Sequence, residues 1–137
     1  MGTEKLLEIT KLQHNLSSLR KLAGWTAEDL GNKVGVTKQT VSNLENFRTS
    51  MTKLQYIAIR AILDYEARRN QNLACALHLV LDDKDATREE HNANEEKVKA
   101  VAAATVAGVN STTLAALLGA ASVVFGAWLA TIMDDND

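Results

Sequence analysis

The chain has 137 residues, enough for one domain and an appendage, and 46% of them are apolar. Proline is absent and there is a single cysteine, which favours a largely helical chain and excludes an internal disulfide. Residues 1–70 carry eleven Lys and Arg against seven Asp and Glu, whereas residues 71–137 carry four against ten. We therefore expect a cytoplasmic protein whose basic first half faces a polyanion and whose acidic second half faces away from it.

The first predicted element is an amphipathic helix from Leu6 to Ala23. Its apolar residues recur at intervals of three and four, which is typical of one buried helix face. Gly24 is a suitable stop for this helix. The residues expected on the buried face are Leu6, Ile9, Leu12, Leu16, Leu19 and Leu22.

Two short helices are predicted next, joined by a tight turn. Thr26 is placed to cap the first, with Asp29 three residues on as the partner in a capping box. This helix ends near Val34, because the glycine at position 35 permits a turn. Thr37 is placed to cap the second, Lys38 to Glu45, which should bury Val41 and Leu44, and residues 48–52 read as a loop.

The remaining predicted elements are also helical. A long helix should run from Leu54 to Arg69 and a short apolar one from Asn72 to Leu81. Residues 82–99 are highly charged and form either a solvated helix or a mobile linker, and residues 100–133 contain no charged residue. The face of the long helix expected to point inward consists of Leu54, Ile57, Ala58, Ala61, Ile62 and Tyr65.

The helix predicted over residues 38–45 carries side chains that can recognise bases. A helix fits the major groove, where Gln and Asn pair with adenine, Lys donates to guanine and a Thr methyl contacts thymine. The candidate base-contacting residues are Lys38, Gln39, Thr40 and Asn43. Phosphate contacts would set the register of so short a helix, either from the free N–H groups at a helix start or from cations in the following loop. Candidates for this role are Thr26, Ala27, Thr37, Arg48 and Lys53.

Residues from about 16 to 64 resemble the Cro/C1-type (Xre-family) helix-turn-helix domain. The resemblance rests on LRKLAGWTAEDLGNKVGVTKQTVSNLEN followed by LQYIAIRAIL. It implies a lambda-repressor-like bundle of four or five helices that binds operator DNA as a dimer. It also implies a semi-buried ion pair between Arg20 and Glu45, whose role would be structural.

Two positions depart from the family pattern. The family usually has alanine where this chain has Gly31, which favours close packing but weakens the helix by roughly 1 kcal/mol. It usually has glycine where this chain has Phe47, so we expect no positive φ at that position. The turn that follows should therefore differ, which leaves the role of Arg48 open.

The apolar C-terminal segment allows two interpretations. Leu114 to Met133 has 20 residues, about the length of a membrane-spanning helix, with lysines before it and aspartates after it. Alternatively, residues 100–109 and 114–133 form a soluble hairpin that pairs with itself or with a second subunit. Small residues spaced by three and four would allow close helix packing in either case: Ala115, Gly119, Ser122, Gly126 and Ala130.

The sequence thus predicts an all-α transcriptional regulator that binds double-stranded DNA, as a homodimeric repressor. Its parts are a helix-turn-helix domain over residues 1–81, a charged linker or helix over 82–99, and an apolar membrane anchor or dimerisation segment over 100–137. The alternative is a protein-interaction module on the same scaffold, an antirepressor or a membrane-tethered adaptor. His14, His78 and His91 are far apart in sequence and no catalytic motif is present, so we expect no enzyme, cofactor or metal.

Overall fold

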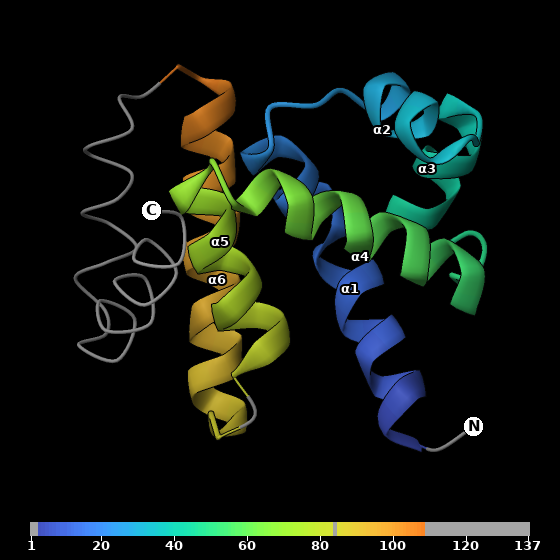
Figure 1. The fold of residues 1–137 in the computed structure, drawn as a ribbon. Helices are drawn as coiled ribbons and strands as arrows, with labels where there is room; N and C mark the ends of the chain where they lie inside the picture. Colours follow the sequence, from blue (N-terminus) through green and yellow to red (C-terminus); the bar gives the residue numbers. More distant parts are fainter. Residues whose placement is uncertain (1–2, 84, 109–137) are drawn as a thin grey trace.

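The computed structural model describes residues 3–83 and 85–108, and Figure 1 shows helices joined by short connections. No strand occurs in these two ranges, which confirms the predicted all-α class. The last short element is a π-helical turn that continues directly from α5. The elements are α1 (Thr3–Leu22), α2 (Ala27–Val34), α3 (Lys38–Glu45), α4 (Lys53–Ala67), α5 (Gln71–Leu77), η1 (His78–Asp82) and α6 (Arg88–Val106).

Helix α1 is the central element of the bundle. It packs against α3, α4, α5, η1 and α6. Five of the six residues predicted for its buried face are buried, and Leu6 is the exception, with 57% of its surface exposed. The buried five are Ile9, Leu12, Leu16, Leu19 and Leu22.

The predicted starts and stops of the short helices are confirmed. Thr26 caps α2 in a reciprocal capping box with Asp29, and Thr37 caps α3. Gly35 ends α2 in the left-handed conformation, with φ of 79°. Gly31 lies against the α2–α3 turn, since a Cβ built there would lie 2.6 Å from the Val36 carbonyl oxygen.

The prediction for the buried face of α4 was wrong for all of its residues except Ile62, which is partly buried against the core. The residues that α4 buries are Tyr56, Ile59 and Leu63. Of the other predicted inward residues, Leu54 is 77% exposed, Ile57 50% and Tyr65 61%, Ala61 is also exposed, and Ala58 is half-buried. Apolar residues thus occupy both the buried and the exposed side of α4.

Most of the charged stretch forms a helix. Residues 88–99 belong to α6, which begins at a capping box between Thr87 and Glu90. Helix α6 packs against α1 and η1 (Figure 1). Val98, Val101 and Ala102 are its buried residues. The division of the chain at residues 81 and 99 stays a prediction, and α6 continues through the second of these positions.

The Glu95 carboxylate of α6 binds His14 and Asn15 of α1, and also His91 one turn earlier on α6 itself. His14 Nε2 lies 3.2 Å from one carboxylate oxygen of Glu95, and His91 Nε2 lies 2.9 Å from the other. The buried Asn15 side chain donates to the same carboxylate at 3.3 Å. Within the described ranges, no group of three or more His, Cys, Asp or Glu residues could hold a metal ion.

The predicted spanning segment, Leu114 to Met133, lies outside the described residues. Within residues 3–83 and 85–108, no helix has the length and the apolar character that crossing a bilayer requires.

Candidate nucleic-acid interface

Helix α3 divides its residues between the core and the surface. Val41 and Leu44 are each 1% exposed and fix the helix against the bundle. On its other side, Lys38 and Gln39 are exposed, and Thr40 and Asn43 are half-buried. The structure therefore brings the four candidate base-contacting residues together on one short helix.

Hydrogen bonds join these polar side chains in pairs. The Gln39 amide donates to Asn43 Oδ1 at 3.0 Å, one helical turn away. The hydroxyls of Thr37 and Thr40 lie 2.9 Å apart, and the Thr40 N–H donates to the Thr37 hydroxyl at 3.1 Å. These contacts limit the rotamers of the surface side chains while leaving further donors and acceptors on each amide for a ligand.

The start of α2 offers a mixed environment for a phosphate. The first N–H groups of a helix have no partner within the helix, and the Thr26 hydroxyl accepts a hydrogen bond while its own proton stays available. The hydrogen bond from the Thr26 N–H lowers the pKa of Asp29, so this carboxylate is charged at neutral pH. Glu28 and Asp29 weaken the attraction of this helix start for an anion.

The loop after α3 carries Arg48, and Lys53 begins α4; both side chains are exposed. The expectation that Phe47 would avoid a positive φ was wrong, because its φ is 58°. The Phe47 N–H donates to the Leu44 carbonyl at 3.3 Å and the Arg48 N–H to the Asn43 carbonyl at 2.9 Å. This is the Schellman pattern, so α3 ends as it would with glycine at position 47.

Arg20 and Glu45 form the ion pair that the family resemblance implied. Two guanidinium nitrogens donate to the two carboxylate oxygens at 2.7 and 2.9 Å, and the side chains are 13% and 11% exposed. The Arg20 guanidinium also donates to the Trp25 carbonyl at 2.9 Å. One side chain of α1 thereby holds both α3 and the segment that leads into α2.

Gln13 is a residue of this region that the sequence did not single out. It lies on α1, is 9% exposed, and bonds only to the backbone of the residues at and after the end of α3. The available signal was a polar residue directly beside the apolar positions of α1, which is a weak signal because such residues more often face water.

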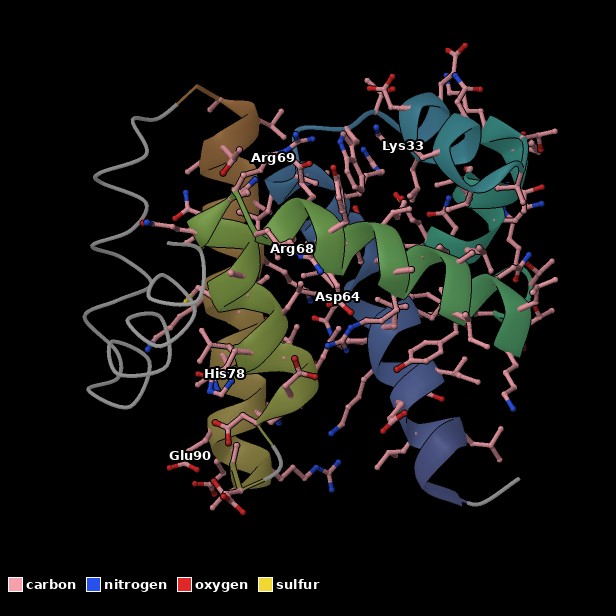
Figure 2. All side chains as sticks on the ribbon, in the orientation of Figure 1. Lys33, Asp64, Arg68, Arg69, His78 and Glu90 are labelled. Carbon is pink, nitrogen blue, oxygen red and sulfur yellow. The ribbon has the colours of Figure 1, made fainter. Side chains whose placement is uncertain are left out.

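Three other basic side chains of the domain lie against aromatic rings. Figure 2 marks Lys33 on α2, and its ammonium group lies 5.0 Å from the centre of the Trp25 ring. Figure 2 also marks Arg68 and Arg69 at the end of α4, where their guanidinium groups lie 5.9 and 5.7 Å from the Tyr65 ring.

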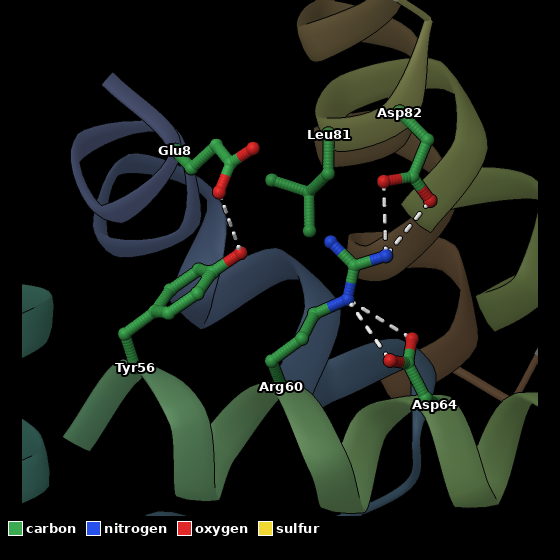
Figure 3. Close-up of a pocket in the computed structure, with 6 residues that line it drawn as sticks. All are labelled: Glu8, Tyr56, Arg60, Asp64, Leu81 and Asp82. Atoms are coloured by element: carbon green, nitrogen blue, oxygen red, sulfur yellow. Dashed lines mark hydrogen bonds and ion pairs between the residues drawn. The ribbon is translucent and has the colours of Figure 1, made fainter. Parts of the chain in front are cut away.

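A pocket of about 310 Å³ is lined by residues of α1, α4 and η1, and by none of α3 (Figure 3). Arg60 crosses it and binds Asp82 at 2.8 Å and Asp64 at 3.0 Å. Burial alone would lower the pKa of Arg60, but these two carboxylates raise it above its usual value. The remaining lining residues are Glu8, Tyr56 and Leu81. We interpret this cluster as a structural tie between α4 and η1.

Comparison with known proteins identifies similar sequences. A family model described as helix-turn-helix matches residues 16–68. The antitoxin HipB of Escherichia coli strain K12 is 30% identical over 64 residues, which make up 47% of this chain and 73% of HipB. HipB of Escherichia coli O6:H1 strain CFT073 is 35% identical over 46 residues, 34% of this chain and 49% of that protein. No solved structure matches the chain.

Proposed function

Because the chain belongs to the Cro/C1-type helix-turn-helix family of DNA-binding regulators, we propose that it is a repressor that recognises a specific operator sequence as a dimer. The observation that carries the proposal is that α3 has one buried apolar side and one polar side that faces outward. Val41 and Leu44 anchor the helix, and its outer surface presents Lys38, Gln39, Thr40 and Asn43. A repressor needs only to occupy its operator, which suits a chain with a recognition helix and no catalytic motif.

In the proposed complex, α3 lies in the major groove with its N-terminal end toward the bases. Gln39 pairs with an adenine, Lys38 donates to a guanine, and Thr40 presents its methyl group to a thymine. The hydrogen bond to Asn43 holds the Gln39 amide in place before the DNA arrives, which reduces the side-chain entropy lost on binding. Contacts to phosphates come from the start of α2, from Thr37, and from Arg48 and Lys53 on the far side of α3.

We propose that the exposed face of α4 joins two copies. Leu54, Ile57, Ala61 and Tyr65 form this face, which we call the α4 stripe. If two stripes pair antiparallel about a twofold axis, each Leu54 meets Tyr65 of the second copy and each Ile57 meets the small Ala61.

A substitution tests the dimer. Ile57→Glu places a charge at the centre of the α4 stripe, so we expect the chain to become monomeric in analytical ultracentrifugation while keeping its helical circular dichroism. The matched control is Asn92→Glu, because Asn92 is exposed on α6, far from the stripe in sequence. Equal sedimentation of the Ile57→Glu variant and the unaltered chain would remove the α4 stripe as the dimer surface.

DNA binding is tested by selecting duplexes from a randomised pool and measuring their affinity over a salt series. We expect a steep loss of affinity with salt, because each phosphate contact releases counterions. Replacing both Gln39 and Asn43 with alanine should lower the affinity for the selected duplex by about 1–3 kcal/mol per base contact. Asn92→Ala removes an exposed amide elsewhere and should change nothing. Recovery of no preferred duplex would contradict the proposal.

A second candidate is a protein-interaction module on the same scaffold. The names of the similar proteins favour it, since both are called antitoxins, and the α4 stripe offers an apolar surface for a protein partner. The two functions separate in cells: an adaptor keeps its activity when Gln39 and Asn43 are both alanine, whereas a repressor loses it.

The membrane anchor over residues 114–133 stays a prediction from the sequence. Fractionation of cells that express the full chain, or a chain ending at Gly108, tests it. An anchor requires the full chain in the membrane fraction and the shortened chain in the soluble fraction. If both are soluble, the hypothesis of a soluble, self-associating segment remains.

A further inference from the structure

One buried amide on α1 holds the segment that follows α3. The Gln13 Nε2 group donates to the Leu44 carbonyl at 3.0 Å and to the Thr49 carbonyl at 2.8 Å, and Gln13 Oε1 accepts from the Met51 N–H at 3.0 Å. All three partners are backbone groups, 31 to 38 residues away in sequence. Both protons of the amide nitrogen are used, together with the amide oxygen.

The backbone groups that Gln13 binds lie on both sides of Arg48 in the sequence. Leu44 lies in the last turn of α3, before Arg48, while Thr49 and Met51 follow it. The Arg48 N–H is bonded to the Asn43 carbonyl at 2.9 Å, and the Met51 side chain is 6% exposed. Residues 46–50 between these anchors are all exposed, and one of them, Phe47, has a positive φ. Gln13 thus fixes an otherwise solvent-facing loop in one register relative to Asn43 on α3.

We propose that Gln13 is a positioning residue for DNA binding, which holds the loop after α3 so that Arg48 meets a phosphate while α3 contacts the bases. This inference rests on the proposed function, because it assigns Gln13 a role only in the presence of DNA. Without Gln13, the loop would have to be ordered when DNA binds, and the contact made by Arg48 would be lost or weakened. The base contacts near the start of α3 would remain.

The experiment compares four chains: the unaltered protein, Gln13→Met, Arg48→Ala and the double variant. Methionine has nearly the same length as glutamine and removes all three hydrogen bonds. Binding to a selected duplex and to a duplex with one changed base pair is measured from low to moderate salt. Asn70→Ala is the matched control, since the Asn70 amide also donates to a distant backbone carbonyl, that of Leu22 at 2.9 Å, but far from the loop in sequence.

We expect Gln13→Met to lower the slope of log affinity against log salt by about one, as Arg48→Ala does, because one phosphate contact is lost. The affinity ratio between the two duplexes should stay the same, and the double variant should bind no more weakly than Arg48→Ala alone. Asn70→Ala should lower the melting temperature without changing the slope.

Other results overturn the inference. A Gln13→Met variant whose slope is unchanged, or whose effect adds fully to that of Arg48→Ala, shows a structural role only. If Gln13→Met does not fold, Gln13→Glu replaces it, since the carboxylate still accepts from the Met51 N–H but donates to neither carbonyl. In the unaltered protein, fast hydrogen exchange at the Met51 amide would itself overturn the inference. A chain that binds no duplex at all overturns the proposed function as well.

Discussion

At the scale of single residues, the backbone conformation of Phe47 could not be predicted from its residue type. Its side chain argues against a positive φ, since the left-handed conformation costs roughly 1–2 kcal/mol for a residue with a Cβ. The structure adopts φ of 58° nevertheless. The two Schellman bonds, together with the bonds from Gln13, favour this conformation, and those from Gln13 join residues more than thirty positions apart. No local pattern reveals such distant partners.

Phe47→Gly should stabilise the fold. Glycine removes the cost of the left-handed conformation, while the greater freedom of its unfolded chain offsets part of the gain. We expect a net increase of about 0.5–1 kcal/mol in the free energy of unfolding, measured by urea denaturation. Phe47→Ala is the control, because it removes the same ring but keeps a Cβ. The explanation fails if the alanine variant is as stable as the glycine variant.

Gly31→Ala should destabilise the fold, although alanine favours helix by about 1 kcal/mol. The added Cβ would lie 2.6 Å from the Val36 carbonyl oxygen, so the backbone of the α2–α3 turn must shift. Overpacking of this kind costs about 1–3 kcal/mol, so we expect a net loss in thermal denaturation. Asn32→Ala, at an exposed position of the same helix, should be neutral or stabilising. A stabilised Gly31→Ala variant would show that the turn can move freely.

At the scale of elements, the helix boundaries could be predicted but the buried face of α4 could not. Threonines 26 and 37 and the glycine at position 35 act through bonds within four or five residues, so the sequence contains the whole cause. The periodicity of α4, in contrast, identifies apolar faces without saying what covers each one. Tyr56, Ile59 and Leu63 form a second, narrower apolar face, and packing against the bundle selects it. The partner of each face lies outside the helix.

The Arg20–Glu45 pair should matter more than a surface ion pair. It joins α1 to α3, and Arg20 also holds the segment before α2, so its loss affects three elements. Glu45→Ala leaves the Arg20 charge largely buried and unpaired, and we expect a loss of about 3 kcal/mol in urea denaturation. For comparison, Glu96→Ala breaks the exposed contact with Lys99 and should cost at most about 0.5 kcal/mol. Replacing both partners, as Arg20→Met with Glu45→Leu, should cost less than Glu45→Ala alone.

At the scale of the whole molecule, α6 extends the packed bundle beyond the residues of the helix-turn-helix domain, because it packs against α1 and η1. The sequence left residues 82–99 open between helix and linker, because a charged stretch shows few of the apolar residues that reveal a buried face. Val98, Val101 and Ala102 are the buried residues of α6, and two of them lie within the uncharged run that follows. The packing of α6 on α1 also depends on Glu95, whose partners on α1 are eighty residues or more away.

Two shortened chains test this role of α6. A chain ending at Gly108 keeps the whole helix, including the glycine with φ of 83° that follows it, so we expect the same melting temperature and the same affinity for DNA as in the full chain. A chain ending at Lys99 loses Val101 and Ala102, each 1% exposed in the bundle. Losing the burial of a valine and an alanine should lower the free energy of unfolding by about 2–3 kcal/mol. Equal stability of the two chains in urea denaturation would mean that the end of α6 contributes nothing to the bundle. Loss of DNA affinity in the chain ending at Gly108 would mean that residues 109–137 take part in binding.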